Sequence, residues 1–275
     1  APFAEMVDAE PGQVDRWLLG ELDLLVGRAT EAMDSFQFDE ALKAIRAFAW
    51  EVLADNYIEL VKARLYGPDA PERRAAQRTL FIALETLCRL LAPFTPFLSE
   101  EIYHSLTGES VHRQRWPEAS GTPIDPAGLA IKEIAAALRR YKAERGLALN
   151  APLPGITVYS DLGIETTDLQ GVANSRVESR RGRPQIEAVP IAVNPQMRVI
   201  GPIFKDRSRR VIEALRSMDP ATVSAQRASG GIRVDIGGEA LEVPPEAVEV
   251  VVENRSAGLA VDLLQVGAAT VMVRR

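Results

Sequence analysis

The sequence predicts a helical bundle over residues 1–150, followed by a smaller α+β domain over residues 151–275. Three observations lead to this fold class. In the first half, apolar residues recur every three to four positions, which is the spacing of amphipathic helices. Near Ala151 the pattern changes to the short apolar runs and alternation typical of strands. The 275 residues, 47% of them apolar, suffice for two domains of about 150 residues each.

The helices of the first half can be placed from their apolar stripes and end signals. Asp15, after Pro11-Gly12, is the expected N-cap of a first helix that runs to about Met33. Trp17 and Trp50 are expected in the core. Further helices are predicted over about residues 38–66, 71–91, 100–106 and 127–145. Short connections between the first four make an antiparallel bundle.

A proline-rich corner separates the third helix from the short fourth one. Phe94 and Phe97 lie beside Pro93 and Pro96, and we expect this corner to be apolar and Phe97 to be buried. Cys88, the only cysteine, lies in an apolar helical run and is expected to be a buried packing residue.

The second half carries strand and turn signals. A strand is predicted over 156–159 and a helix over 204–218. Gly237-Gly238 between two short apolar runs predicts a hairpin of strands 232–236 and 240–243. Further strands are expected over 248–252, 260–266 and 270–273.

The residues provide no catalytic constellation. Neither Gly230-Gly231 nor Gly237-Gly238 is followed by the Lys-Ser/Thr of a phosphate-binding loop. One cysteine and two histidines cannot form a thiolate-rich zinc site. We therefore expect no catalytic residue and no metal site. Cysteine usage and the absence of a signal peptide or membrane-length apolar run predict a cytoplasmic protein.

Charge is unevenly distributed along the chain, whose net charge is −6. Residues 1–120 carry 20 acidic and 12 basic side chains, whereas residues 121–218 carry 10 acidic and 15 basic ones. A basic middle in an acidic protein is compatible with a local RNA-contacting surface. Solvated helix surfaces explain the same counts, so charge alone leaves both interpretations open.

Several stretches resemble the region that follows the catalytic core in class I tRNA synthetases for branched aliphatic amino acids. The resemblance covers nearly the whole chain, with the motifs in family order. They are residues 15–19 (D-R-W-L-L), 38–42 (F-D-E-A-L), 54–66 (A-D-N-Y-I-E-L-V-K-A-R-L-Y), 91–103 (L-A-P-F-T-P-F-L-S-E-E-I-Y), 110–117 (S-V-H…R-W-P) and 200–205 (I-G-P-I-F-K). The third is most similar to the archaeal-type valyl enzymes, which also have an α+β tail.

This resemblance implies an anticodon-binding helical domain that belongs to a valine–tRNA ligase. The implied partners are tRNA(Val) and upstream catalytic and editing domains of the same polypeptide, where ATP and Mg would bind. The family's H-I-G-H and K-M-S-K-S signatures are absent from residues 1–275, so we expect this chain alone to be inactive and without a cofactor. The alternatives are a free-standing synthetase-like RNA-binding or protein-interaction module, or the equivalent region of an isoleucyl enzyme.

RNA binding by such a bundle requires cations for the phosphates. The candidates lie at the end of the second long helix, on the fifth helix and at the start of the tail helix. They are Lys62, Arg64, Arg139, Arg140, Lys142, Arg145, Lys205, Arg207, Arg209 and Arg210. The competing interpretation is ordinary solvated helix surface, and Glu59 is spaced to pair with Lys62.

Overall fold

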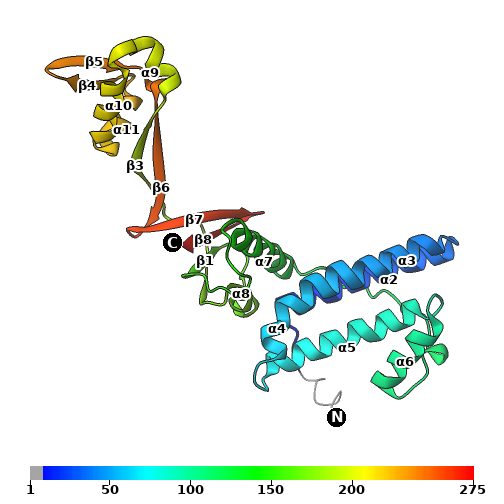
Figure 1. The fold of residues 1–275 in the computed structure, drawn as a ribbon. Coiled ribbons are helices and arrows are strands. Elements are labelled where there is room, and N and C mark those ends of the chain that lie inside the picture. Colours follow the sequence, from blue (N-terminus) through cyan, green and yellow to red (C-terminus); the bar gives the residue numbers. More distant parts are fainter. Residues whose placement is uncertain (1–8) are drawn as a thin grey trace. The chain divides into compact units, whose positions relative to one another are not determined.

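The computed structural model describes residues 9–275 and forms two compact units (Figure 1). The first unit comprises the chain up to Arg183 together with Leu263–Val273. The second comprises Pro184–Asp262 with Arg274–Arg275. Helices dominate the first unit, and the second mixes helices and strands, so the expected fold class is confirmed.

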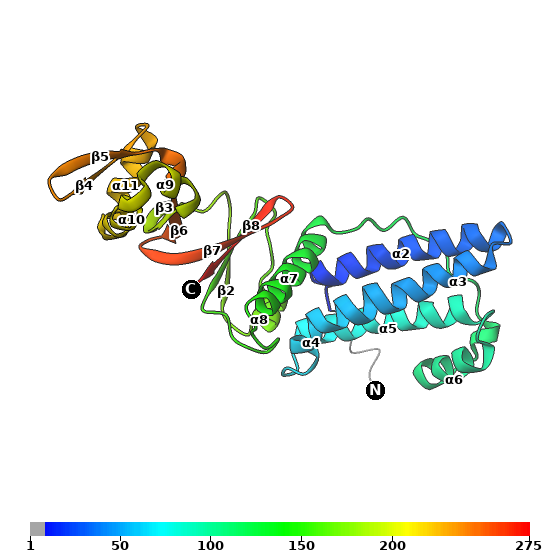
Figure 2. The same cartoon turned by 45° about the horizontal axis from the view of Figure 1, so that its top comes forward.

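The helices of the first unit follow the expected order. They are α2 (Gln13–Asp34), α3 (Phe38–Ala47), the π-helix η1 (Phe48–Ile58), α4 (Glu59–Leu65), α5 (Pro71–Leu91), α6 (Pro96–Thr107), the 3-10 turn η2 (Val111–Arg113) and α7 (Pro126–Glu144). Figures 1 and 2 show α2, α3 and α5 lying side by side as a bundle. Cys88 is buried in a small cluster with Tyr103 and Val111, as expected, and burial raises the pKa of its thiol to about 11.

Helix α2 begins earlier than expected. Its N-cap is Gly12, and Asp15 is the third helical residue, whose carboxylate accepts a hydrogen bond from the Gly12 amide at 2.9 Å. The expectation that Asp15 is the N-cap was therefore wrong. Asp15 is buried, and its carboxylate also accepts hydrogen bonds from Arg64 and Tyr57, as described below.

The long second helix contains a π-helical stretch that changes which side chains point inward. Within η1, Phe48, Leu53 and Tyr57 are buried, at spacings of five and four residues. A π-helix has more residues per turn than an α-helix, so the inner stripe expected at α-helical spacing shifts. Trp50 lies beside Lys43, Arg46 and Glu51 on the polar side of this helix and is 69% exposed, which contradicts its expected place in the core, whereas Trp17 is buried as expected.

The proline corner is only partly apolar. Helix α6 begins at Pro96, and Phe97 in its first turn is 90% exposed. Phe94, one residue before Thr95, is partly buried against the main core. The expectation that Phe97 is buried was wrong, because α6 buries the side that carries Ser99 and Tyr103, and Phe97, two positions before Ser99, lies on the other side of the helix.

Helix α7 packs closely against α2. A Cβ atom on Gly128 would lie 2.1 Å from the Gln13 carbonyl oxygen and 2.6 Å from Trp17 Cβ, so only glycine permits this approach. Beyond it, α7 buries Ile131, Leu138 and further side chains of the same stripe in the main core.

The first unit also contains strands. In it β1 (Ile156–Tyr159) pairs in parallel with β2 (Val177–Arg180) and antiparallel with β8 (Ala269–Arg274), and α8 (Thr167–Ala173) precedes β2. Leu153, Ile156 and Val158 join the same apolar core as the helices. The change of pattern near residue 150 thus marks a change of secondary structure, and the compact unit extends to Arg183 because its strands share the helical core.

The second unit has a core of its own. Its elements are β3 (Glu187–Pro195), α9 (Met197–Phe204), η3 (Lys205–Arg207), α10 (Ser208–Ser217), α11 (Pro220–Ala228), β4 (Ile232–Ile236), β5 (Glu239–Val243), η4 (Pro245–Ala247), β6 (Val248–Ser256) and the start of β7 (Leu259–Val266). Strands β4 and β5 form the expected hairpin, and β3 pairs antiparallel with β6. The helix expected over 204–218 is α10, which begins later, at Ser208, because Lys205 adopts a positive φ of 49° and ends the preceding helix α9.

Candidate nucleic-acid interface

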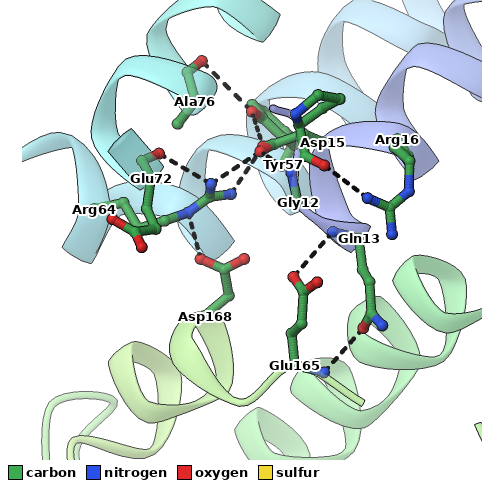
Figure 3. Close-up of polar contacts among 11 residues, drawn as sticks. Gly12, Gln13, Asp15, Arg16, Tyr57, Arg64, Glu72, Ala76, Glu165 and Asp168 are labelled. Carbon is green, nitrogen blue, oxygen red and sulfur yellow. Dashed lines mark hydrogen bonds and ion pairs between the residues drawn. The ribbon is translucent and has the colours of Figure 1, made fainter. Parts of the chain in front are cut away.

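A buried ionic network connects three helices of the first unit (Figure 3). Arg64 on α4 donates two hydrogen bonds to Asp15 on α2, at 2.9 and 2.8 Å. Its Nε donates a third, at 2.8 Å, to Asp168 on α8. The Tyr57 hydroxyl donates to Asp15 at 2.6 Å. The network therefore holds α8 against the bundle through one guanidinium group.

Burial and neighbouring charges shift the pKa values of Arg64 and Asp168 in opposite directions. Burial acts to lower the pKa of Arg64, but hydrogen bonds and the charge of Asp15 outweigh it, so the pKa of the guanidinium lies above its usual value. Burial raises the pKa of Asp168 to about 6, against the opposing charge of Arg64. Burial and then the Asp15 carboxylate raise the pKa of the Tyr57 phenol well above its usual value.

Arg64 consequently cannot serve as the phosphate contact expected from the sequence. Its side chain is 7% exposed and all its bonds go to groups of the protein, including the Glu72 carbonyl oxygen at 3.1 Å. The helical period indicates this burial, because Arg64 lies four and three residues after the buried Leu60 and Val61, on the same side of α4.

Lys142 is the second expected contact that the structure removes from the surface. The side chain is fully buried, and its ammonium group donates to the carbonyl oxygens of Leu149 at 2.8 Å and Val172 at 2.9 Å. Burial lowers the pKa of this ammonium. Lys142 thus ties the loop after α7 and the end of α8 to α7. The helical period indicates this burial, because Lys142 lies four residues after the buried Leu138, on the same side of α7.

The other expected cations of the first unit reach the surface. Lys62 on α4 is exposed and lies 3.3 Å from Glu59. Arg140 and Arg145 are exposed at the end of α7, and the Arg145 guanidinium lies 4.7 Å from the centre of the Tyr141 ring. Arg139 is half-buried, and its Nη2 atom is buried without a hydrogen-bond partner among residues 9–275.

Lys62 and Arg139, 77 positions apart in the sequence, line the same hollow. It has a volume of about 500 Å³ and lies between α4, α7, the loop after α7 and α8. Tyr66, whose side chain is 85% exposed, lines it as well. Tyr66 is not among the RNA-contacting residues expected from the sequence; its place just after Lys62 and Arg64 was the available signal.

The remaining expected cations lie in the second unit. Lys205, Arg207, Arg209 and Arg210 are all exposed around the start of α10. Arg207 pairs with Glu239 at 2.8 Å and Arg209 with Glu213 at 3.4 Å. As expected, these cations lie at the positive end of a helix dipole, an arrangement that bound anions would stabilise.

Comparison with known proteins identifies the family of this chain. Residues 15–158 match the family described as the anticodon-binding domain of tRNA ligase. The chain belongs to this family. It is also 58% identical over its whole length to the valine–tRNA ligase of Methanothrix thermoacetophila, and 40% identical over 94% of its length to that of Archaeoglobus fulgidus.

The anticodon-binding domain match runs from the start of α2 to β1, and so includes α4 and α7. The chain spans 32% and 31% of the lengths of these two relatives and corresponds to the C-terminal part of the ligases. A third relative, the valine–tRNA ligase of Methanosarcina barkeri, is 49% identical over 95% of the chain. These relatives favour the valyl expectation over the isoleucyl enzyme and the free-standing module. None of the helices described in residues 9–275 has the length and apolar character that crossing a membrane requires.

Proposed function

We propose that this chain binds tRNA(Val) and orients it for esterification with valine by the upstream catalytic part of a valine–tRNA ligase. The observation that supports the proposal most directly is the group of exposed cations on α4 and at the end of α7, within a unit that matches an anticodon-binding domain. ATP and Mg act in the upstream part, and an editing domain belongs to the same polypeptide. Charging of tRNA for protein synthesis places the protein in the cytoplasm.

In this proposal Lys62, Arg140 and Arg145 contact the phosphates of the RNA backbone. Such contacts release condensed counterions, so they provide affinity that depends on salt and little sequence information. The buried groups Arg64 and Lys142 act indirectly, since they hold α4, α7 and α8 in the arrangement that displays these cations. The cations at the start of α10 form a second set of phosphate contacts.

The proposal is tested with the 275-residue chain and fluorescently labelled tRNA(Val), tRNA(Ile) and an unrelated tRNA. Anisotropy titrations at several salt concentrations give the affinity and its salt slope. Replacing Lys62, Arg140 and Arg145 together with Gln is expected to weaken binding of tRNA(Val) and to reduce the slope by about 2–3. Binding of tRNA(Val) no tighter than that of the unrelated tRNA would contradict the proposal.

A matched control replaces three exposed cations on α2 and α3: Arg28, Lys43 and Arg46. This variant has the same change of charge, so a general loss of electrostatic attraction would affect both variants equally. We expect the control to keep the salt slope of the unmodified chain. If instead only the control lowers the slope, the RNA lies along α2 and α3, and the assignment to α4 and α7 is wrong.

A further inference from the structure

Residues 184–262, which make up nearly all of the second unit, are inserted between two strands of the first unit. Arg180, at the end of β2, and Thr270, near the start of β8, are both register partners of Tyr159, on opposite sides of β1. Two strands that flank a third lie about 10 Å apart. The chain therefore leaves the sheet of the first unit and returns to it at neighbouring points, an arrangement that tolerates inserted domains.

The insertion buries an apolar core of its own. Ile200, Val211 and Leu215 pack with further buried side chains of the second unit, and this cluster contains no residue of the first unit. The strands β1 and β8 instead share the core of the helical bundle. A domain with its own core can fold and unfold separately from its host.

Basic side chains are concentrated in one segment of the insertion. Residues 197–217, which form α9, η3 and α10, carry six basic and two acidic side chains, whereas the rest of 184–262 carries three basic and nine acidic ones. Arg207 and Arg209 take part in ion pairs, but Lys205 and Arg210 are exposed and make none among residues 9–275. A local positive surface of this kind attracts a polyanion even where the net charge is negative.

Aromatic side chains are almost absent from the insertion. The chain has 8 Phe, 3 Trp and 5 Tyr residues, of which Phe204 alone lies in 184–262. Phe204 is partly buried against the core of the second unit. Proteins that recognise unstacked bases stack them on exposed aromatic rings. The insertion therefore offers cations to phosphates and no exposed ring to a base.

We propose that the insertion binds the RNA backbone without reading bases, so that it adds affinity for tRNA and contributes nothing to the choice between tRNAs. Contacts to phosphates position a nucleic acid but carry no sequence information directly. This inference rests on the proposed function and assigns a separate role to the second unit within it. Because the insertion has its own core, its removal leaves the first unit folded and able to discriminate between tRNAs.

The first test compares two double variants of the 275-residue chain in salt titrations with labelled tRNA(Val), tRNA(Ile) and an unrelated tRNA. Lys205→Gln with Arg210→Gln is expected to reduce the salt slope by about 1.4–1.8 for every tRNA, the value for two phosphate contacts. The ratios between the three affinities should stay as in the unmodified chain. Arg227→Gln with Arg233→Gln removes the same charge from exposed positions of α11 and β4 and should leave the slope unchanged.

A deletion variant tests the insertion as a whole. Residues 184–262 are replaced by a flexible Gly/Ser linker of about eight residues, whose ends lie roughly 16 Å apart on average. We expect this variant to keep the helical circular dichroism of the first unit. It should bind all three tRNAs more weakly by the same factor and retain the preference of the unmodified chain for tRNA(Val).

Hydrogen exchange of the full chain tests whether the two units unfold separately. Val211→Ala, at a fully buried position in the core of the second unit, leaves a cavity there. Exchange should accelerate for amides within 184–262 and stay unchanged in α2, α5 and α7. Equal acceleration in both units would show that the insertion does not fold independently.

The outcomes separate this inference from the proposed function. If the unmodified chain binds none of the tRNAs, the proposed function fails and this inference fails with it. If it binds tRNA(Val), and neither the deletion nor the Lys205 and Arg210 double variant changes affinity or slope, only this inference is overturned and the second unit contacts a protein instead. If the double variant changes the ratios between the tRNAs, the insertion reads bases and the inference is likewise overturned.

Discussion

The guanidinium group of Arg64 holds the carboxylate of Asp15 through two hydrogen bonds of 2.9 and 2.8 Å, although the residues lie 49 positions apart. The third bond of the same group reaches Asp168, 104 positions away. One side chain thus connects α2, α4 and α8 (Figure 3). Because α4 and α8 form two sides of the hollow, the shape of the candidate RNA site depends on this buried ion network.

Loss of the Arg64 side chain should therefore destabilise the first unit strongly. Arg64→Met leaves the carboxylates of Asp15 and Asp168 buried without their partner, which costs about 3–5 kcal/mol of unfolding free energy. Urea unfolding followed by circular dichroism measures the change. Lys62→Met, two residues away on the exposed side of α4, should change stability by less than about 0.5 kcal/mol. Equal effects in the two variants would show that the network contributes no stability.

The raised pKa of Asp168 predicts a specific pH dependence. Because its pKa in the folded chain is about 6, above the ordinary value of 3.8, the folded state retains a proton that the unfolded state releases between these values. Stability therefore falls as pH rises through this window, by up to about 1.4 kcal/mol per pH unit.

Comparison of the unmodified chain with Asp168→Asn isolates this effect. Unfolding free energies measured from about pH 4 to about pH 7 should show the unmodified chain losing stability relative to the variant. Asp161→Asn, at an exposed position, is the control and should run parallel to the unmodified chain. If the unmodified chain instead gains unfolding free energy relative to Asp168→Asn as pH rises, the pKa of Asp168 is lowered in the folded chain and the prediction is wrong.

Lys142 should stabilise the first unit through its carbonyl partners. Lys142→Met keeps the buried stem but leaves the carbonyl oxygens of Leu149 and Val172 without their donor, at a cost of about 1–3 kcal/mol. Hydrogen exchange should also accelerate in the loop after α7. Arg140→Met, on the exposed side of the same helix, provides the reference and should leave both measurements unchanged.

The exposure of Phe97 predicts a small effect on stability. Phe97→Ala should change the unfolding free energy by less than about 0.5 kcal/mol, because the side chain is 90% exposed. Leu90→Ala, at a fully buried position of α5, should cost about 2–5 kcal/mol. Thermal melts of both variants provide the comparison. A large loss of stability in Phe97→Ala would show that this side chain is buried in the core of the bundle.

The amino-acid sequence by itself determined where most of the helices of the first unit lie. The period of apolar residues and the end signals predicted α5 over 71–91 and α7 over about 127–145, close to their bounds in the structure. The turn glycines predicted the β4–β5 hairpin. These features are local, since helix period and turn geometry depend on residues within a few positions of one another. The motif order likewise indicated the tRNA ligase family.

Tertiary structure alone decided which cations are available to RNA. Arg64 and Lys142 are charged residues in apolar stripes, and the helix period indicates that they face the core but does not show which groups would compensate their charge there. Their partners, Asp15, Asp168 and the Val172 carbonyl, lie 30 to 104 positions away. Only the packing of α2, α4, α7 and α8 brings these groups together. A buried charge is stable only where such partners converge, and convergence of distant groups is a property of the fold.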